Sequence, residues 1–368
     1  MPTGELAAWL RLLLTPGVGR DSARKLLAAL GPPETIFAQT RPVLHAVVGP
    51  RLAEALLVEP EGFADALAQL KAWLDADPQR QLIPLGDPAY PADLLETADP
   101  PVLLHALGDA SLMQHPRRLA IVGSRNPTAQ GADNARQFAR ALGEAGVCVV
   151  SGLALGVDGA AHEGALDAGA PTIAVVGTGL DRVYPKRHLD LARRIVAQQG
   201  LILSEYPLGT PPLAPHFPLR NRLIAGLSQG TLVVEAALQS GSLITARMAA
   251  EQGREVFAIP GSIHSPQARG CHALIRQGAK LVESAQDILE DLRIATPTAL
   301  APASDADTAT GPDDPLLAAL GFDPVSLDAL QARTGLDTAT LQTRLLELEL
   351  DGLVARLPGG LLQRLGTA

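Results

Sequence analysis

Short runs of apolar residues alternate with glycine-rich turns and longer amphipathic stretches through the middle of the chain. The longer stretches place apolar residues three and four positions apart, which is typical of helices that pack on one face. Short apolar strands that alternate with such helices predict a doubly wound, mostly parallel sheet covered on both faces. The fold class is therefore α/β and Rossmann-like. The predicted strands are residues 119–122, 146–150, 172–176, 201–205, 231–234 and 256–259.

The N-terminal segment follows another pattern. The first 80 residues predict a small helical domain, in which helix, PGVG turn and helix resemble a helix-hairpin-helix unit. In that unit the backbone N–H groups of the turn hold a DNA phosphate. A plain tight turn within a helical domain is the alternative. Residues 75–91, with their Pro, Gly and Asp, predict a linker to the middle segment.

The C-terminal segment predicts three helices and a hairpin, the element order of a winged helix. Its third helix, at 337–350, carries one arginine against Asp337, Glu347 and Glu349. A winged helix binds duplex DNA through its third helix, so the acidic residues here predict a module that packs against a protein and contributes little to any DNA binding. A stretch rich in Ala, Pro, Thr and Asp precedes it and predicts a disordered linker. The patterns together divide the chain into residues 1–80, 81–294, 295–313 and 314–368.

The composition excludes several classes of protein. With 47% apolar and 19% charged residues among 368, the chain is globular. It has no signal-like segment and no apolar run long enough to span a bilayer, so we expect a cytoplasmic protein without a membrane partner. Cys148 and Cys271 form no CxxC pattern and the eight histidines form no HExxH pair. Neither a disulfide framework nor a bound metal or other cofactor is expected.

Charge is distributed unevenly along the chain. The formal net charge of −9 argues at first against a nucleic-acid partner. However, residues 116–276 hold 16 Lys and Arg against 11 Asp and Glu, whereas the rest of the chain holds 14 against 28. Because binding depends on the local field, a basic middle between acidic flanks predicts an anionic ligand held by the middle.

Turns of small residues follow four of the predicted strands. In a doubly wound sheet, ligands bind at the carboxyl ends of the strands, so these turns are expected to converge on one edge. Small residues allow the backbone to approach a ligand, and each following helix directs N–H groups towards it. The candidate turn residues are Gly123, Ser124, Gly152, Gly156, Gly177, Gly179, Ser240, Gly241 and Ser242.

Residues 216–228 place two arginines and an asparagine at the start of a helix that Pro218 favours. Cations there meet the positive end of the helix dipole, a cost that a bound anion would explain. Two solvated arginines on a surface helix are the alternative. Whether Arg220 grips phosphate or holds the loop in shape stays open. The candidate phosphate-binding set is Arg125, Lys186, Arg187, Arg220, Asn221 and Arg222.

Several spaced cations suit a chain of phosphates better than a single nucleotide. Aromatic residues make up only 3% of the chain, so base stacking must be limited. This predicts strong salt dependence and little sequence preference. The candidates for stacking are Tyr184, His188, His216 and Phe217.

Enzyme alternatives fit this pattern less well. No strand is followed by GxGxxG and no GxxxxGK[ST] motif exists, which disfavours a dehydrogenase or a P-loop enzyme. A Rossmann-type nucleotide-binding or nucleotide-hydrolysing enzyme with Glu235 as base is one alternative. Asp158 and His162 are four residues apart and could form an acid–base or metal pair, although a structural aspartate and a packed histidine are favoured. An adaptor with a merely structural middle is the third hypothesis.

Six stretches resemble the DNA processing protein A (DprA/Smf) family of bacteria. They keep their order and spacing across the middle of the chain, which makes the match more specific than any one glycine turn. The stretches are AIVGSRNPT (120–128), VVSGLALGVDGAAHEGAL (149–166), AVVGTGLDRVYPKRH (174–188), SEYPLGTPPLAPHFPLRNRLIAGLS (204–228), VVEAALQSGSLITA (233–246) and GREVFAIPGSI (253–263).

The resemblance implies a non-enzymatic protein of natural transformation with an extended Rossmann-like domain. Such a protein binds incoming single-stranded DNA in a basic pocket, shields it from nucleases, helps to load the RecA recombinase and works as a homodimer. The family's pocket residues map to Arg125, Lys186 and the set Arg220, Asn221 and Arg222. Its dimer or recombinase surface maps to Leu274, Ile275, Gln277, Lys280 and Leu281.

Overall fold

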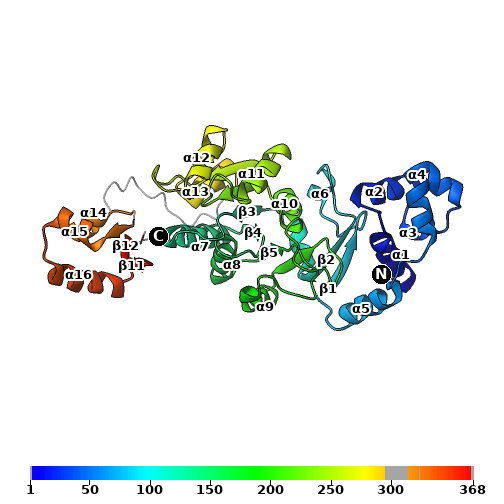
Figure 1. The fold of residues 1–368 in the computed structure, drawn as a ribbon, viewed down its shortest axis with the longest axis horizontal. Helices are drawn as coiled ribbons and strands as arrows, with labels where there is room; N and C mark the ends of the chain where they lie inside the picture. The colour runs from blue at the N-terminus through cyan, green and yellow to red at the C-terminus, as the bar shows by residue number, and fades with distance from the viewer. Residues whose placement is uncertain (1, 295–313, 323, 366–368) are drawn as a thin grey trace.

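The structure is a computed structural model that describes residues 2–294, 314–322 and 324–365. The disordered linker predicted at 295–313 lies outside the described residues. A helical N-terminal part, a central sheet with helices on both faces and a small C-terminal part follow one another along the chain (Figure 1). Within these described segments, no helix combines the length and the hydrophobicity that a membrane span needs.

The N-terminal part is helical, as predicted. Trp9, Leu12, Leu26 and Ile36 form its buried core. Its kinked fourth helix contains Gly49 at a φ of 78° followed by Pro50, both of which interrupt regular helix geometry. The helices are α1 (Thr3–Leu14), α2 (Arg20–Leu30), α3 (Pro33–Phe37), α4 (Arg41–Leu57) and α5 (Phe63–Asp75).

The central sheet has nine strands in the order β1-β2-β6-β5-β4-β3-β7-β8-β9. All neighbours pair in parallel except β1 with β2 and β2 with β6, so the predicted mostly parallel Rossmann-like sheet is confirmed. The strands are β1 (Arg80–Pro84), β2 (Leu103–Gly108), β3 (Arg118–Val122), β4 (Cys148–Ser151), β5 (Thr172–Val175), β6 (Leu201–Ser204), β7 (Gly230–Val233), β8 (Glu255–Ala258) and β9 (Lys280–Leu281).

The linker predicted at residues 75–91 is wrong in part. β1 lies inside this range and pairs antiparallel with β2, a second strand that the apolar pattern did not single out. The flanking Pro, Gly and Asp residues predict turns, and a five-residue edge strand between turns has little periodicity of its own. With β9 at the opposite edge, the sheet therefore has three strands more than the alternating pattern indicates.

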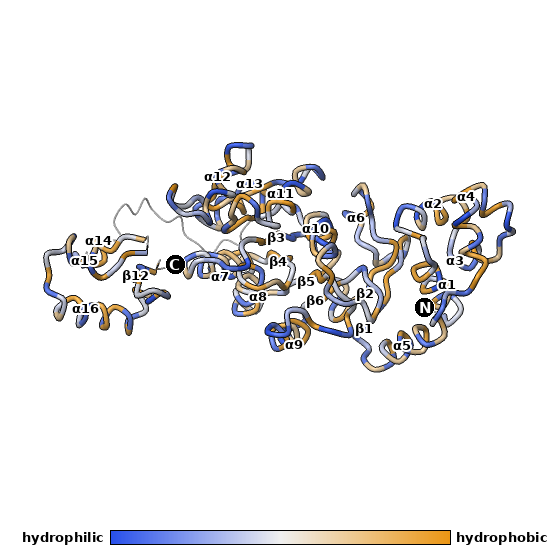
Figure 2. Tube along the Cα trace, viewed as in Figure 1, coloured by the Kyte–Doolittle hydropathy of each residue, from blue (hydrophilic) through white to orange (hydrophobic). Residues whose placement is uncertain are grey.

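Helices pack on both faces of the sheet, and apolar residues gather between the layers (Figure 2). On one face Leu223 and Ala246 belong to the buried cluster, and on the other Phe138 and Ile288 do. The helices of this part are α6 (Ala92–Leu95), η1 (Ala110–Gln114), α7 (Ala129–Glu144), α8 (Val157–Asp167), η2 (Lys186–His188), α9 (Leu189–Ala197), α10 (His216–Gly226), α11 (Ser242–Glu251), α12 (Arg269–Arg276) and α13 (Ala285–Asp291).

The strand order reverses at β3, which lies between β4 and β7. In register, Val122 at the end of β3 pairs with Val233 at the end of β7, so the loops that follow both strands leave the sheet side by side. Such a switch point opens a crevice at the carboxyl edge. This position within the fold brings the segments after residues 122 and 233 together.

The C-terminal part has the winged-helix order that the sequence predicts. Leu330, Leu341 and Leu345 lie in its own buried cluster. Its three-stranded sheet has the order β10-β12-β11 with antiparallel pairing. The elements are α14 (Pro315–Leu320), β10 (Val325–Ser326), α15 (Leu327–Thr334), α16 (Thr338–Leu350), β11 (Val354–Leu357) and β12 (Leu361–Arg364).

Candidate functional site

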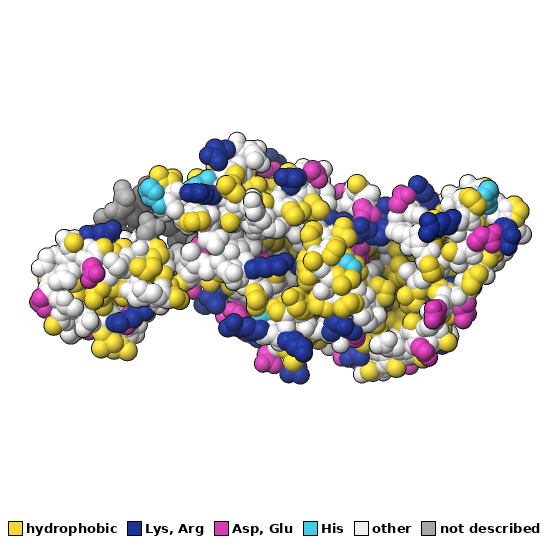
Figure 3. All heavy atoms as spheres, in the orientation of Figure 1, with side chains coloured by type: hydrophobic (Ala, Val, Ile, Leu, Met, Phe, Trp, Pro, Cys, Tyr) yellow, Lys and Arg dark blue, Asp and Glu magenta, His cyan; other side chains and the backbone are white. Residues whose placement is uncertain are grey.

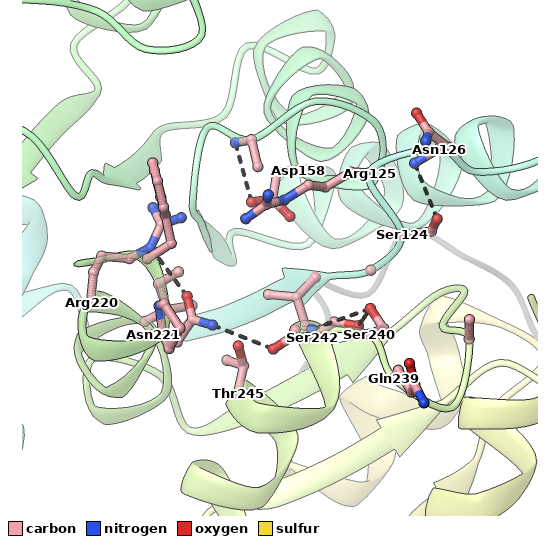
Figure 4. A pocket seen from close by; sticks show the side chains of 18 of the residues that line it. Ser124, Arg125, Asn126, Asp158, Arg220, Asn221, Gln239, Ser240, Ser242 and Thr245 are labelled. Carbon is pink, nitrogen blue, oxygen red and sulfur yellow. Dashed lines mark hydrogen bonds between the residues drawn. The ribbon is translucent and has the colours of Figure 1, made fainter. Parts of the chain in front are cut away.

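A cavity of about 450 Å³ opens at the switch point (Figure 4). The turn after β3, the start of α10 and the turn that leads into α11 form its walls. Gly123, Ser124 and Arg125 come from the first of these segments, and Ser240, Gly241 and Ser242 come from the third. The predicted convergence of turns on the carboxyl edge therefore holds for these two turns.

The glycines of the turns are required mainly by neighbouring protein atoms. A Cβ on Gly123 would lie 2.6 Å from the Val157 side chain, and one on Gly156, whose φ is +80°, would lie 2.4 Å from the Ser124 carbonyl oxygen. A Cβ on Gly241 would meet no atom within 4 Å. Close approach to a ligand, which the sequence predicts for all the turns, is thus available at Gly241, whereas Gly123 and Gly156 let two turns pack together.

Arg220 holds the floor of the cavity in shape. Its side chain is buried, and its Nη1 donates to the carbonyl oxygen of Gly152 at 2.6 Å and to that of Val175. Burial lowers the pKa of Arg220 to about 10. These bonds tie the ends of β4 and β5 to α10, which gives Arg220 a structural role in the wall of the cavity that it lines.

Asp158 completes this floor. Its Oδ2 accepts hydrogen bonds from the backbone N–H groups of Gly152 at 3.2 Å and Ala154 at 3.3 Å. Burial raises the pKa of Asp158, and the nearby Arg220 guanidinium opposes that rise. A Cβ on Gly152 would lie 2.6 Å from the Asp158 carboxylate and 2.7 Å from Arg220, so only glycine fits between them.

The structure corrects the predicted placement of Arg222. Two residues along a helix are about 200° apart, so Arg222 projects from α10 on the side opposite Arg220. Its buried guanidinium pairs with Glu205 and, through Nε at 3.1 Å, with Asp99. Arg222 lines neither this cavity nor the smaller one described below, because these two carboxylates already hold it.

The same two carboxylates bind the N-terminal helices. Arg20 on α2 lies 3.0 Å from Asp99 and 3.4 Å from Glu205, and Arg24 also pairs with Asp99. Arg20 directly follows the PGVG turn, so the cation beside the helix-hairpin-helix-like turn is engaged in a contact between domains. This cluster joins α2 to α10.

Arg125 is the exposed cation of the cavity. Its guanidinium lies 5.5 Å from the centroid of the Phe217 ring, and it forms no ion pair with any residue that the structure describes. It also lines a second, smaller cavity of about 80 Å³, which shares Ala154, Phe217 and Arg220 with the larger one. Arg125 therefore borders two adjoining hollows and has no ion-pair partner among the described residues.

The smaller cavity is aromatic and apolar. Tyr184 and Phe217 lie with their ring centroids 5.6 Å apart, and Leu155, Val176 and Pro185 add apolar surface to the wall. Of the four predicted stacking candidates, these two reach the cavity. His188 instead approaches the Leu153 carbonyl oxygen at 3.0 Å, and His216 stacks on Tyr206.

The remaining predicted residues divide between the cavities and their surroundings. Asn221 lines the larger cavity, and Gly152 and Gly177 line the smaller one. Gly156 and Gly179 line neither. Lys186 and Arg187 are exposed in η2 just beyond Tyr184, outside both cavities, and form no ion pair within the described segments.

Four polar side chains in the larger cavity were missed in the sequence. Asn126 and Gln239 directly adjoin predicted residues, so a wider window around each turn would have found them. Thr245 lies one helical turn after Ser242, which helix periodicity could have indicated. Gln267 lies in a distant loop that no motif marks. Its amide nitrogen donates to the Asn126 carbonyl oxygen at 3.2 Å, which brings that loop to the site.

The candidate bases of the enzyme alternatives are engaged in local bonds. The Glu235 carboxylate accepts hydrogen bonds from the backbone N–H of Thr128 at 2.9 Å and from its hydroxyl at 2.6 Å. His162 is fully buried, its Nδ1 lies 2.7 Å from the Thr172 hydroxyl, and burial lowers its pKa to about 3. Asp158 is held beside Arg220, so these side chains have structural partners.

The residues predicted as a dimer or recombinase surface lie at the opposite edge of the sheet from β1. Leu274 and Ile275 pack partly into the core from α12, whereas Gln277 and Leu281 are exposed. Lys280 pairs with Glu255 at 3.2 Å and Asp291 at 3.1 Å. The functional role of this surface stays a prediction.

The fold and the cavities define a Rossmann-like protein with a pocket at the sheet's switch point that presents one unpaired arginine. The chain belongs to the DNA recombination-mediator protein A family, whose family model matches residues 81–293. A second model, the DprA winged helix domain, matches residues 298–360.

Characterised relatives and solved structures agree with this membership. Protein Smf of Escherichia coli strain K12 is 45% identical over 294 residues, which are 78% of each chain. DNA processing protein DprA of Bacillus subtilis strain 168 is 43% identical over 69% of this chain and 85% of its own. The structure of DprA from Streptococcus pneumoniae superposes with a TM-score of 0.65 at 40% identity, covering 78% of this chain and 97% of the other.

The description of another solved relative mentions a ligand. The structure of DNA processing protein A from Helicobacter pylori has a TM-score of 0.53 and 34% identity, and covers 58% of this chain and 96% of its own. Its description refers to a single-stranded DNA binding mode of that protein.

Proposed function

We propose that the protein binds single-stranded DNA in the two adjoining cavities, with Arg125 as the cation that meets a phosphate. The observation that carries this proposal is the exposed, unpaired guanidinium of Arg125 between a polar and an aromatic hollow. The Helicobacter pylori relative, described as a single-stranded DNA binder, supports the same ligand. An unpaired cation beside aromatic rings suits a strand whose phosphates and bases are both accessible.

The strand leaves the pocket over Tyr184 towards Lys186 and Arg187. Both cations are exposed and lie next in the chain after the aromatic wall. Three neutralised phosphates give a slope of about −2 for the logarithm of the binding constant against the logarithm of salt concentration. Arg220 contributes indirectly, by keeping the β4 and β5 ends in place.

The biological role that we propose is that of a non-enzymatic mediator of natural transformation in the cytoplasm. The protein would shield incoming single-stranded DNA, work as a homodimer and help to load the RecA recombinase. Family membership supports this role. The half-exposed Leu281 on edge strand β9 supports a contact surface there, since an exposed apolar residue on an open edge favours association.

A titration of the intact protein with a fluorescently labelled dT oligonucleotide, at several salt concentrations, tests the proposal. We expect salt-sensitive binding that is weaker for blunt duplex and falls at least about tenfold in Arg125→Ala. Arg140→Ala is the matched control, because Arg140 is an exposed arginine on α7 whose partner is Glu144. Equal affinities of the Arg125→Ala and Arg140→Ala variants would refute the proposal.

The same assay separates the enzyme alternative. A Rossmann-type nucleotide enzyme would bind a mononucleotide at least as tightly as the oligonucleotide, and would turn it over. We expect neither, because a single nucleotide reaches Arg125 but leaves Lys186 and Arg187 outside the cavities without a phosphate. Hydrolysis of a mononucleotide that is lost in Glu235→Gln would favour the enzyme.

A further inference from the structure

The helix α16 of the C-terminal part carries an apolar stripe on its exposed face. Leu341, Leu345 and Leu348 point into the domain's core, which leaves the other side of the helix to solvent. On that other side, Leu346 is 53% exposed and Leu350 is 81% exposed. Figure 3 shows apolar side chains reaching the surface over this part of the chain.

The stripe has the spacing of a helix-packing seam. The exposed residues Ala339, Thr343, Leu346 and Leu350 follow one another at intervals of four, three and four. Alternating intervals of three and four keep side chains on one line along a helix, as in the a and d positions of a coiled coil. Leu346 and Leu350 supply the bulk, and the small residues before them let a second helix approach closely.

Carboxylates flank the stripe. Between residues 337 and 351 four acidic residues stand against Arg344 alone. Glu347 and Glu349 immediately adjoin the two leucines. Glu347 forms a solvent-exposed ion pair with Arg344 at 3.1 Å, whereas Glu349, whose side chain is 21% exposed, pairs with Arg356 at 2.5 Å. An exposed pair contributes little and exchanges easily, so an incoming cation can replace Arg344.

This charge pattern excludes two occupants of the face. Duplex DNA would meet a net negative helix, although the third helix of a winged helix is the element that enters the major groove in DNA readers. A second copy of the chain would bring glutamates against glutamates at the positions that flank a coiled-coil seam. The remaining occupant is a helix of opposite charge.

We infer that α16 is a docking surface for a basic amphipathic helix of a protein partner. In this arrangement the partner's leucine or isoleucine residues pack between Leu346 and Leu350, and its lysines or arginines pair with Glu347 and Glu349. The inference is independent of the DNA pocket, because it rests on a separate domain with its own core.

The probe is a pair of synthetic amphipathic helices of about three heptads with leucine at a and d. One carries lysine at e and g, and the other carries glutamate there. With the intact protein, we expect the lysine peptide to bind and the glutamate peptide not to bind. Peptide anisotropy should report at least about a tenfold loss of affinity in Leu346→Gln/Leu350→Gln.

Matched variants keep the test decisive. Leu57→Gln/Leu95→Gln removes two leucines that are 40% and 52% exposed elsewhere, and should leave peptide affinity unchanged. Glu347→Gln/Glu349→Gln should weaken binding and flatten its salt dependence. The inference fails if both peptides bind equally, or if the Leu346 and Leu350 changes have no effect. It also fails if those changes abolish a dimer in sedimentation velocity or abolish duplex DNA binding. The first result would show that a second copy of the chain occupies the face, and the second that duplex DNA does.

Discussion

Replacement of Arg222 tests whether this arginine has a structural role or contacts DNA. Arg222→Met keeps most of the side-chain volume but removes the charge that faces Glu205 and Asp99. The Glu205 side chain is only 6% exposed, so the change leaves a nearly buried carboxylate with Arg20 at 3.4 Å as its remaining partner. Removal of one member of a buried ion pair costs about 3–5 kcal/mol.

We expect the lower end of that range, because Arg20 still reaches Glu205. For a domain of this size each kcal/mol lowers the melting temperature by about 2–4 °C, so the expected shift is about 6–12 °C. Thermal unfolding followed by circular dichroism measures it. Affinity for a dT oligonucleotide, measured well below the transition, should change little.

Two further variants make the reasoning refutable. Arg222→Met/Glu205→Gln should recover much of the lost stability, since it removes the stranded charge as well. Arg140→Met, which breaks an exposed pair with Glu144, should leave the melting temperature almost unchanged. A normal melting temperature for Arg222→Met together with a large loss of DNA affinity would show that Arg222 contacts DNA.

Two other predictions follow from the floor of the pocket and from the buried histidines. Gly156→Ala should destabilise the protein by more than about 1 kcal/mol in chemical denaturation, because φ is +80° and the new Cβ would lie 2.4 Å from the Ser124 carbonyl oxygen; unchanged stability would contradict the close packing of the two turns. Burial lowers the pKa of His162 to about 3 and that of His105 to about 4, against an ordinary value of 6.5. The folded state therefore favours neutral histidines, so the stabilisation that these two groups contribute should be fully present above pH 6.5 and should be lost as the pH falls towards 4. A His162→Gln/His105→Gln variant whose melting temperature depends on pH in the same way as that of the unchanged protein would contradict this reasoning.

Much of the central fold could be predicted because parallel strands buried on both faces are continuous apolar runs. β3 and β5 are of this kind, and every residue in them is buried. β1 lacks that signal, because an antiparallel edge strand is only partly covered and its pattern of burial is mixed. Its place in the sheet depends on pairing with β2, a contact that periodicity does not encode.

The site was predictable to the level of segments but not of side chains. Arg125 follows directly from its place after β3, whereas Arg220 and Arg222 share one short motif and serve two different partners. Helical rotation turns Arg220 towards the carbonyl groups of β4 and β5 and turns Arg222 towards Glu205. The carboxylates that pair with Arg222 lie in other segments of the sequence, so no local pattern could indicate these ion pairs.

Whether a basic residue of the middle segment can bind a polyanion depends on its ion pairs with carboxylates and not on how many basic residues the segment holds. Half of its 16 cations form ion pairs with carboxylates, and the buried Arg220 is held by carbonyl oxygens. A paired arginine must lose its own carboxylate before it can bind phosphate, so its contribution to affinity is small. Arg125, Lys186 and Arg187 carry no such cost, and all three lie on or beside the aromatic cavity. Of the seven cations of this segment, besides Arg220, that form no ion pair with a described residue, these three lie on or beside the aromatic cavity, so they are the ones that a strand bound there can reach.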